Sequence, residues 1–344
     1  MAKVIEKKKP LIGQGTYGCI YYPEITCSGV LGESKKLISK LQIEGHVSEN
    51  EIIIGELIKK ISNYKDFFAP VISICPINVS KIKTDVSDCN ALRGKRDLVL
   101  MKMDYVKHVD LYDYLENKKF FFKRYFNTFE YLLLAIQKLT EVGIIHYDMH
   151  LGNIVLNKAN NLPIIFDFGL SINTNSIDFR HLSKNFFKLA PDFSIWCLEI
   201  QIINFFSTIQ DTPITLIQLK NIINEYIKHC KALSLFSKSF VENYKISAVN
   251  FFEKYVGVNK NEVVRDLLTY FQLWDQYALC INYLKLIKNK PVDLKNPLIQ
   301  NLFKILTMNI NPNPTKRYSI AQTIEEFKKL KKIKVTKNYG FGIN

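Results

Sequence analysis

One short polar segment, residues 146–153, lies between two apolar stretches and reads HYDMHLGN. Its Asp148 and Asn153 place a carboxylate and an amide oxygen on a single loop. A carboxylate can orient a substrate hydroxyl or accept its proton, and an amide oxygen can bind a hard cation. A zinc pair made by His146 and His150 would need a helix, which the glycine in the segment disfavours. The segment therefore predicts a general base beside a cation ligand.

A second carboxylate, Asp167, ends the apolar run Ile164–Phe166 and opens the turn Phe168-Gly169. By itself this is an ordinary turn aspartate. Together with Asn153, however, it supplies the oxygen ligands that magnesium prefers and can share with phosphate groups. We therefore predict Asn153 and Asp167 as metal ligands.

A glycine-rich segment near the N-terminus could approach phosphate oxygens. Gly13, Gly15 and Gly18 follow the spacing Gly-x-Gly-x-x-Gly, and Ile20 comes just after them. Glycine leaves backbone N–H groups accessible to an anion. A hairpin that binds no ligand would give the same pattern. A dinucleotide-binding turn is disfavoured because Cys19–Tyr22 continues as a strand rather than as a helix.

Lys40 ends the run Leu37-Ile38-Ser39-Lys40 of an apolar strand, where a side chain should be buried. A buried ammonium needs an anionic partner, and the following helix offers Glu51 and Glu56. Glu51 lies on the inward stripe with Ile54, whereas Glu56 lies on an outer, lysine-rich face. We therefore predict that Glu51 pairs with Lys40, with Glu56 as the other choice. The alternative role for Glu51 is half of a capping box with Ser48.

These residues need elements that hold them in place. The first third of the chain is typical of strands around one helix, Ser48–Ile61, which Ser48 can cap. A polar and basic insertion, residues 78–97, interrupts the strands. The part after Lys107 is typical of long amphipathic helices. The predicted strands are Leu11–Tyr22, Leu37–Ile43, Val71–Ile77 and Leu98–Tyr105, and the predicted helices are Phe120–Val142, Ile195–Thr208, Ile214–Ala232, Asn261–Leu286 and Leu298–Met308.

The composition is that of an ordinary globular protein. The 344 residues are 47% hydrophobic and 23% charged, which allows a full core, and no apolar run reaches membrane-spanning length. The start of the chain lacks the apolar stretch of a secretory signal, so we expect a cytoplasmic location. The seven cysteines are odd in number and irregularly spaced, which predicts free thiols in a reducing compartment.

The formal net charge of +15 comes mostly from an excess of lysine. A solvated basic face accounts for such an excess. The alternative is attraction to an acidic protein, to nucleic acid or to an anionic membrane surface. No aromatic residues are interleaved with the lysines, as a stacking surface for nucleic-acid bases would require.

Together, in this order, the motifs form the set of parts that phosphoryl transfer requires. Over roughly residues 10–330 the sequence resembles the eukaryotic-type protein kinases of the serine/threonine class. The resemblance implies a two-lobed α+β fold, with a small antiparallel β-rich N-lobe containing one main helix over residues 1–105. A larger, mostly α-helical C-lobe would span 106–335, and a tail would follow over 336–344. It also implies ATP and Mg²⁺ as cofactors, with Mn²⁺ as a substitute, and γ-phosphate transfer to serine or threonine of a protein substrate.

The resemblance assigns a role to each motif. Asp148 would be the catalytic base, and Asn153 and Asp167 would bind magnesium. Lys40, tied to Glu51, would hold the α- and β-phosphates. The nucleotide would further contact Gly13, Gly15, Gly18 and Ile20, the hinge residues Asp104 and Val106, and Asp110 at the ribose.

Two residues depart from the family pattern. Tyr147 stands where the family carries an arginine that receives activation-loop phosphate, which predicts activity that does not depend on phosphorylation of that loop. His150 stands where serine/threonine kinases carry a lysine, so charge support for the transferred phosphate should be weaker or pH-dependent. The same departure leaves tyrosine open as an acceptor.

Two further features refine the resemblance. The segment Ala190-Pro191-Asp192 is similar to the family's Ala-Pro-Glu, with a shorter acid and compressed spacing. Asp192 and Glu199 are both available to pair with Arg317 of the late Pro-x-x-Arg element, and the sequence does not choose between them. The strand that begins GCIYYP and the helix that contains NEIII also resemble protein kinases of large cytoplasmic DNA viruses.

Three other functions compete with a protein kinase. Residues 146–153 are similar to the His-Gly-Asp-Leu-His-Pro-Gly-Asn segment of aminoglycoside and choline kinases, which phosphorylate small molecules. A kinase-like scaffold without catalysis is opposed by the presence of every catalytic side-chain type. A nucleic-acid binder rests on the net charge alone.

Overall fold

The computed structural model of the chain describes residues 10–94, 97–116, 121–208, 213–288 and 295–331. The chain divides into two compact units. The first comprises Met1–Val109 and Asn157–Ser171, and the second comprises Asp110–Leu156 and Ile172–Asn344. The sequence placed a single boundary after residue 105, whereas the first unit also includes the later segment that carries Asp167. The predicted tail, 336–344, lies outside the described residues.

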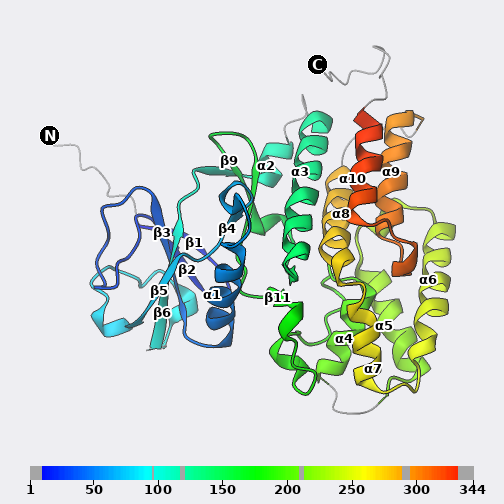
Figure 1. Cartoon of the computed structure of the whole chain (residues 1–344), viewed down its shortest axis with the longest axis horizontal. Helices are drawn as coiled ribbons and strands as arrows, with labels where there is room; N and C mark the ends of the chain where they lie inside the picture. The colour runs from blue at the N-terminus through cyan, green and yellow to red at the C-terminus, as the bar shows by residue number, and fades with distance from the viewer. Residues whose placement is uncertain (1–9, 95–96, 117–120, 209–212, 289–294, 332–344) are drawn as a thin grey trace. The chain divides into compact units, whose positions relative to one another are not determined.

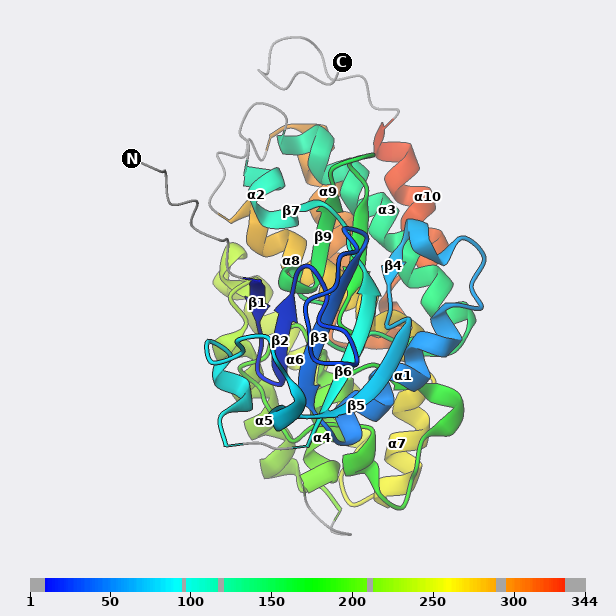
Figure 2. The ribbon, with the colours of Figure 1, turned by 90° about the vertical axis from the view of Figure 1, so that its left-hand side faces the viewer.

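The first unit is built on a five-stranded antiparallel sheet in the order β1-β2-β3-β6-β5, which Figure 2 shows side by side. A short strand, β4, pairs in parallel with β10 in the same unit. The strands β7 (His108–Asp110) and β9 (Ile154–Asn157) lie where the chain passes between units. The bounds within the first unit are β1 Leu11–Gln14, β2 Gly18–Tyr21, β3 Leu37–Ile43, β4 Phe68–Ala69, β5 Ser73–Asn78, β6 Asp97–Asp104 and β10 Pro163–Phe166.

Helix α1 spans His46–Ile58, so it begins before the predicted start at Ser48 and ends three residues early. Ser48 lies inside the first turn, where its Oγ accepts a hydrogen bond from the Gly45 N–H at 3.0 Å. Ser48 is therefore not the N-cap residue; it lies within the first turn and binds the N-cap residue, Gly45. Ile54, Ile58 and Glu51 are buried on the inward face, as the periodicity predicts.

Because successive side chains of a strand point to opposite faces, the sheet has two distinct apolar surfaces. One contains Val99, Met101 and Met103 and packs against Ile52 of α1. The opposite surface contains Leu41, Leu98 and Leu100 and packs against the insertion that follows β5.

That insertion is more than a solvated loop. It contains two short 3₁₀ turns, Val79–Lys81 and Asn90–Leu92. Cys89 and Leu92 are buried in the sheet core, at 2% and 5% exposure. Its charged residues gave it a polar appearance in the sequence, but its apolar side chains cover one face of the sheet.

Two disulfides cross-link the first unit, so the prediction of free thiols is wrong for four of the seven cysteines. Cys19 of β2 is bonded to Cys89 of the insertion, and Cys27, in the loop before β3, is bonded to Cys75 of β5. The Cα atoms are 5.9 and 6.0 Å apart, which is the usual separation. The partners are 70 and 48 positions apart in sequence, so only the sheet topology brings them together. The free cysteines are Cys197, Cys230 and Cys280, all buried.

The second unit is mostly helical. Figure 1 shows α3, α8, α9 and α10 lying alongside one another. A two-stranded ladder, β8 (Ile144–Ile145) with β11 (Ile172–Asn173), flanks the polar segment 146–153. The helices are α2 Leu111–Glu116, α3 Phe121–Glu141, α4 Leu198–Thr208, α5 Leu216–His229, α6 Lys238–Phe252, α7 Lys260–Leu268, α8 Trp274–Ile287, α9 Pro297–Asn309 and α10 Ile320–Lys331.

The predicted helix Asn261–Leu286 is in fact two helices, α7 and α8, with a 3₁₀ turn, Phe271–Leu273, between them. Helix α7 buries one stripe, whereas nearly every residue of α8 is buried. A helix apolar on all sides belongs in a core, and an amphipathic one belongs at a surface. Apolar residues continue across the break, so periodicity alone could not reveal it.

The antiparallel sheet in the N-terminal part and the mostly helical remainder confirm the predicted α+β class. Within the described ranges, no helix combines the length and the apolar character needed to span a membrane.

Candidate active site

Lys40 joins two carboxylates in the first unit. Its Nζ donates hydrogen bonds to Glu51 Oε2 at 2.8 Å and to Asp167 Oδ1 at 3.0 Å. The side chains of Lys40 and Glu51 are 9% and 2% exposed, whereas that of Asp167 is 43% exposed. The cluster therefore buries one ion pair and leaves the second carboxylate accessible to solvent.

The charges of this cluster keep Lys40 protonated. Burial alone would lower the pKa of Lys40, but the carboxylates of Glu51 and Asp167 outweigh burial and raise that pKa above its ordinary value. Burial also raises the pKa of Glu51, against the opposing effect of the Lys40 ammonium. Lys40 is a permanent cation at neutral pH.

Glu51 is the partner of Lys40, as its position on the helix predicts. Glu56 pairs with Lys59 on the outer face of α1. The capping-box alternative for Glu51 is wrong, because Ser48 forms its bond with Gly45.

The turn after Asp167 packs directly on α1. Asp167 adopts a left-handed backbone conformation, with φ of 61°, which is uncommon for a residue with a side chain. Asn50 of α1 donates from Nδ2 to the carbonyl oxygens of Gly169 at 3.0 Å and Ser171 at 2.8 Å. A Cβ at Gly169 would lie only 2.9 Å from Val47 of α1. The helix that supplies Glu51 therefore also fixes the turn that presents Asp167.

The three glycines of the β1–β2 hairpin differ in what surrounds them. A Cβ at Gly18 would clash with the carbonyl oxygen of Leu41, so the close approach of β3 requires glycine there. A Cβ at Gly13 would make ordinary contacts with Ile20, and one at Gly15 would meet only the carbonyl oxygen of Gly18 at 4.0 Å. The fold of the first unit thus explains Gly18 but does not explain Gly13 or Gly15.

In the second unit, Asp148 and Asn153 are in direct contact. Asn153 Nδ2 donates to Asp148 Oδ2 and to the Asp148 carbonyl oxygen, both at 3.0 Å. Burial alone would raise the pKa of Asp148, but hydrogen bonds and charge from His150, with support from His146 and Asn153, lower it below its ordinary value. Asp148 is therefore an ionised acceptor, and the amide oxygen of Asn153 is left for another ligand.

His150 uses both ring nitrogens in this loop. Its Nδ1 accepts a hydrogen bond from the Gly152 N–H at 3.0 Å, and its Nε2 lies 3.5 Å from Asp148 Oδ2. An accepting Nδ1 places the proton of the neutral ring on Nε2, toward Asp148. His146 and His150 do not lie on a helix, which removes the geometric basis of the zinc alternative.

Tyr147 belongs to the loop of residues 146–153, and its side chain is buried against α4. Its hydroxyl donates to Asn204 Oδ1 at 2.7 Å, and its ring stacks on Trp196 at a centroid distance of 4.7 Å. The Trp196 indole N–H donates to the Tyr147 carbonyl oxygen at 2.7 Å. Burial raises the pKa of Tyr147, so its hydroxyl stays a donor. Tyr147 has a φ of 69°, a strained conformation that persists only where the surroundings enforce it.

Two residues of α8, which the sequence motifs did not single out, hold the loop of residues 146–153. Asp275 accepts the backbone N–H groups of His146 at 2.6 Å and Tyr147 at 3.0 Å, and burial raises its pKa. Asn282 Nδ2 donates to the Met149 carbonyl oxygen at 2.7 Å. The available signal was Asp275, a charged residue in a largely apolar helix. A charged residue in an apolar element is also what singled out Lys40 on its strand.

Glu199, not Asp192, pairs with Arg317. The guanidinium donates two parallel hydrogen bonds, NH1 to Oε1 at 2.7 Å and NH2 to Oε2 at 2.9 Å. Both side chains are 0% exposed. Arg317 Nε also donates to the Asn311 carbonyl oxygen at 2.7 Å. This buried pair connects the start of α4 with the segment before α10.

The residues assigned to adenine and ribose have partners of their own. Asp104, at the end of β6, forms an ion pair with Lys65 at 2.9 Å. The Val106 carbonyl oxygen accepts a hydrogen bond from His108 Nδ1 at 2.7 Å. Asp110 is the exposed last residue of β7. Their roles toward a nucleotide stay predictions.

The oxygen donors present suit a cation that brings other ligands with it. Over the ranges that the structure describes, no three His, Cys, Asp or Glu side chains gather into a metal cluster. Magnesium is commonly held by one or two protein oxygens, with phosphates and water completing its shell. Asp167 offers a carboxylate oxygen of that kind, and Asn153 offers an amide oxygen; that the two bind one ion stays a prediction.

Comparison with known proteins gives two matches. Residues 96–192, which include Asp148, Asn153 and Asp167, match the ABC1 atypical kinase-like domain. The chain is also 24% identical over 218 residues to the cell cycle serine/threonine-protein kinase hsk1 of Schizosaccharomyces pombe. That match covers 56% of this chain and 39% of the yeast protein, so the chain spans well under half the length of this relative. The chain is therefore kinase-like.

Proposed function

We propose that this kinase-like chain is a protein kinase that transfers the γ-phosphate of ATP to serine or threonine hydroxyls. The observation that carries the proposal is the bond of Lys40 to both Glu51 and Asp167. Burying an ion pair such as Lys40–Glu51 is a poor way to stabilise a fold, because desolvation offsets most of the Coulombic gain. Such a cluster is understandable where the ammonium and the exposed carboxylate serve a phosphate and its metal ion.

The other residues would act by positioning and charge. Gly13 and Gly15 would admit phosphate oxygens to the backbone N–H groups of the hairpin. Asp148 would orient the acceptor hydroxyl and accept its proton. Asn153 and Asp167 would hold Mg²⁺ or Mn²⁺, which when bound supplies positive charge to the phosphates.

The net charge indicates the class of protein substrate. The net charge of +15 favours an acidic protein over a basic one. The resemblance to kinases of large cytoplasmic DNA viruses supports a cytoplasmic protein of viral origin as part of the same proposal.

Radiolabelled ATP offered with acidic and basic protein acceptors, followed by phosphoamino-acid analysis, tests the proposal. We expect phosphoserine or phosphothreonine, with an acidic acceptor preferred. Label on choline or an aminoglycoside but on no protein would establish the small-molecule alternative. Nucleotide binding without any transfer would establish a scaffold. Binding to plain duplex DNA that weakens steeply with salt, in the absence of ATP binding, would establish the nucleic-acid alternative.

Gly15 and Gly18 should respond differently to alanine. In Gly15→Ala the free energy of unfolding should change by less than about 1 kcal/mol, because the site has room for a methyl group, while ATP affinity falls. In Gly18→Ala the clash with Leu41 should lower the free energy of unfolding by about 1–3 kcal/mol. Thermal melts and fluorescent-nucleotide titration measure the two quantities. Unchanged ATP affinity in a folded Gly15→Ala protein would contradict a phosphate role for the hairpin.

Protonation of Asp148 should not limit the reaction near neutral pH. The lowered pKa of Asp148 keeps this base ionised at every pH above its ordinary value near 3.8. A pH–rate profile should therefore show no loss of turnover from protonation of this carboxylate between about pH 8 and about pH 5.5.

Variants of His150 test the separate prediction that this side chain supports the transferred phosphate. In His150→Gln a side-chain oxygen can still accept the Gly152 N–H, so the loop should keep its shape while the imidazole is lost. A wild-type profile that is flat, and unchanged in His150→Ala, would remove histidine from the mechanism.

Activity should survive complete dephosphorylation. Tyr147 stands in place of the arginine that would bind a phosphate, and it is already held by Asn204 and Trp196. The segment 146–153 therefore needs no phosphate on the later segment, residues 171–183, to order it. Protein treated with phosphatase, then freed of it and checked by mass spectrometry, should show unchanged turnover. Loss of activity traced to a phosphate on Ser171, Thr174, Ser176 or Ser183 would contradict this expectation.

A further inference from the structure

The Cys19–Cys89 disulfide lies at the base of the glycine-rich hairpin. Gln14 and Cys19 face each other across β1 and β2, directly before and after the turn that contains Gly15 and Gly18. They are the last paired residues at this end of the hairpin. Contacts that hold Gln14 and Cys19 in place therefore also set the orientation of the turn between them.

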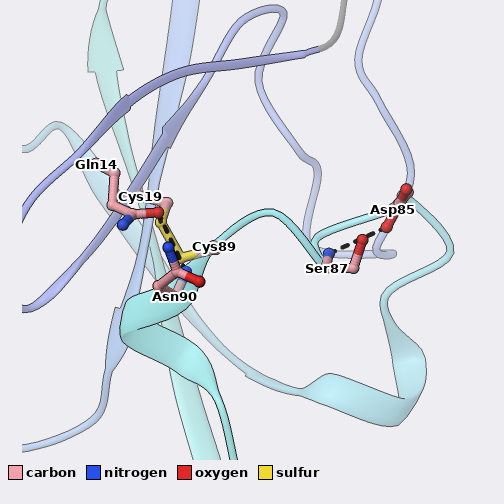
Figure 3. The surroundings of a disulfide bond; sticks show 6 residues. All are labelled: Gln14, Cys19, Asp85, Ser87, Cys89 and Asn90. Carbon is pink, nitrogen blue, oxygen red and sulfur yellow. Dashed lines mark hydrogen bonds between the residues drawn. A yellow bond between two sulfur atoms is a disulfide. The ribbon is translucent and has the colours of Figure 1, made fainter.

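Both residues are attached to the same short piece of the insertion (Figure 3). Cys19 is covalently bonded to Cys89. The side-chain oxygen of Gln14 accepts a hydrogen bond from the N–H of Asn90, the next residue, at 3.1 Å. One side of the hairpin is thus held by a disulfide and the other by a hydrogen bond to the adjacent residue.

The insertion is buried in the core, and β2 is paired with β3, whereas β1 and the turn have less support. Cys89 and Leu92 are 2% and 5% exposed within the sheet core. Strand β1 is four residues long and, among the strands that the structure describes, pairs with β2 alone. The turn has one internal backbone bond, from Gly15 N–H to the Gly18 carbonyl oxygen at 2.9 Å, among the described contacts. Short edge segments of this kind open readily, so their order depends on external attachment.

We propose that the Cys19–Cys89 disulfide and the Gln14–Asn90 hydrogen bond form a clamp that positions the glycine-rich hairpin for nucleotide phosphates. Nucleotide affinity then depends on the oxidation state of this one disulfide. The inference rests on the proposed function, since it needs a nucleotide at the hairpin. Reduction breaks the S–S bond and forms two S–H groups; the two electrons and two protons come from a dithiol, which itself becomes a disulfide.

The second disulfide provides a matched control. Cys27–Cys75 lies in the same unit but joins the β2–β3 loop to β5, away from the hairpin base. The two bonds close loops of 70 and 48 residues, so chain-entropy arguments give them similar effects on stability. A merely stabilising role would make both bonds matter equally for nucleotide binding.

The test uses the full chain purified without reductant. Alkylation after denaturation should label only Cys197, Cys230 and Cys280, and prior reduction should expose all seven cysteines. Fluorescent-ATP titration and hydrogen exchange of the amides of residues 11–21 are then measured with and without dithiothreitol. Reduction should raise the Kd by about 3- to 10-fold, the scale expected when a binding segment loses its preorganisation, and should speed exchange in the hairpin.

The variants locate the effect. Cys19→Ser/Cys89→Ser should bind weakly whether or not dithiothreitol is present. Cys27→Ser/Cys75→Ser should bind tightly when oxidised and lose affinity on reduction. In the oxidised protein, Gln14→Met, which has no acceptor oxygen, should raise the Kd by about 2- to 3-fold. Equal effects of the two double variants on the Kd would reduce the clamp to a stabilising cross-link.

Hydrogen exchange separates this inference from the proposed function. If the oxidised wild-type chain binds no nucleotide, the proposed function fails, and with it the nucleotide role of the clamp. Exchange that still quickens on reduction would then show that the clamp orders the hairpin for some other purpose. Hairpin exchange that does not change on reduction overturns the clamp whatever the affinity for nucleotide.

Discussion

Replacing Asp148 with asparagine will lower turnover by about 10²- to 10⁴-fold while the Kd for ATP changes by less than about threefold. The carboxylate is ionised, because hydrogen bonds and charge from His150 outweigh the effect of burial on its pKa. Asparagine keeps an oxygen that can accept from Asn153, so the loop should hold its shape. What is lost is the charge that, in the proposed function, would orient a hydroxyl and take its proton. Steady-state phosphate transfer and nucleotide titration measure the two effects.

Two further variants make the Asp148 result specific. Lys40→Met should damage ATP binding and turnover together, because it removes the ammonium that would contact the phosphates. Asp113→Asn changes an exposed carboxylate of α2 and should leave both quantities as they were. If Asp148→Asn retained most of its turnover with unaltered thermal stability, Asp148 would not be the base.

Arg317→Met should lower the free energy of unfolding by about 3–5 kcal/mol, because it leaves the carboxylate of Glu199 buried without a partner. For a unit of this size, that corresponds to a fall in Tm on the order of 10 °C. The double variant Arg317→Met/Glu199→Met should recover most of the loss, since no isolated charge then remains. Urea unfolding followed by circular dichroism measures all three proteins.

Asp192→Asn tests which of the two candidate acids, Asp192 or Glu199, pairs with Arg317. Arg317 contacts Glu199 through both guanidinium NH groups, and Asp192 is exposed. The free energy of unfolding of Asp192→Asn should therefore match that of the wild type. A loss as large as that of Arg317→Met would assign the pair to the wrong acid.

Features that depend on one element and its burial could be predicted from the sequence. Strand β3 has the bounds that its apolar pattern indicates. Lys40 and Glu51 were paired correctly because a charge on a buried strand requires a partner, and helical periodicity places only one glutamate inward. The contact between Asp148 and Asn153 likewise follows from their spacing on a single loop.

Features that depend on how distant elements meet could not be predicted. Glu199 and Asp192 are chemically equivalent candidates in the sequence, and only tertiary packing buries one of them against Arg317. The Cys19–Cys89 bond depends on an insertion that folds back over the sheet. Asp275 supports a loop well over a hundred positions before it, and local patterns do not connect them.

If the proposed function holds, the hydrogen bond from Lys40 to Asp167 Oδ1 would also make metal and nucleotide binding depend on each other. A divalent ion bound by this oxygen would lie close to an ammonium, and the two positive charges would repel. A polyphosphate between them would cancel that repulsion and so favour binding of the ion. By thermodynamic reciprocity, the ion would raise the affinity for polyphosphate by the same factor. The bare cation and the uncomplexed nucleotide should each be poor ligands, and their complex a good one.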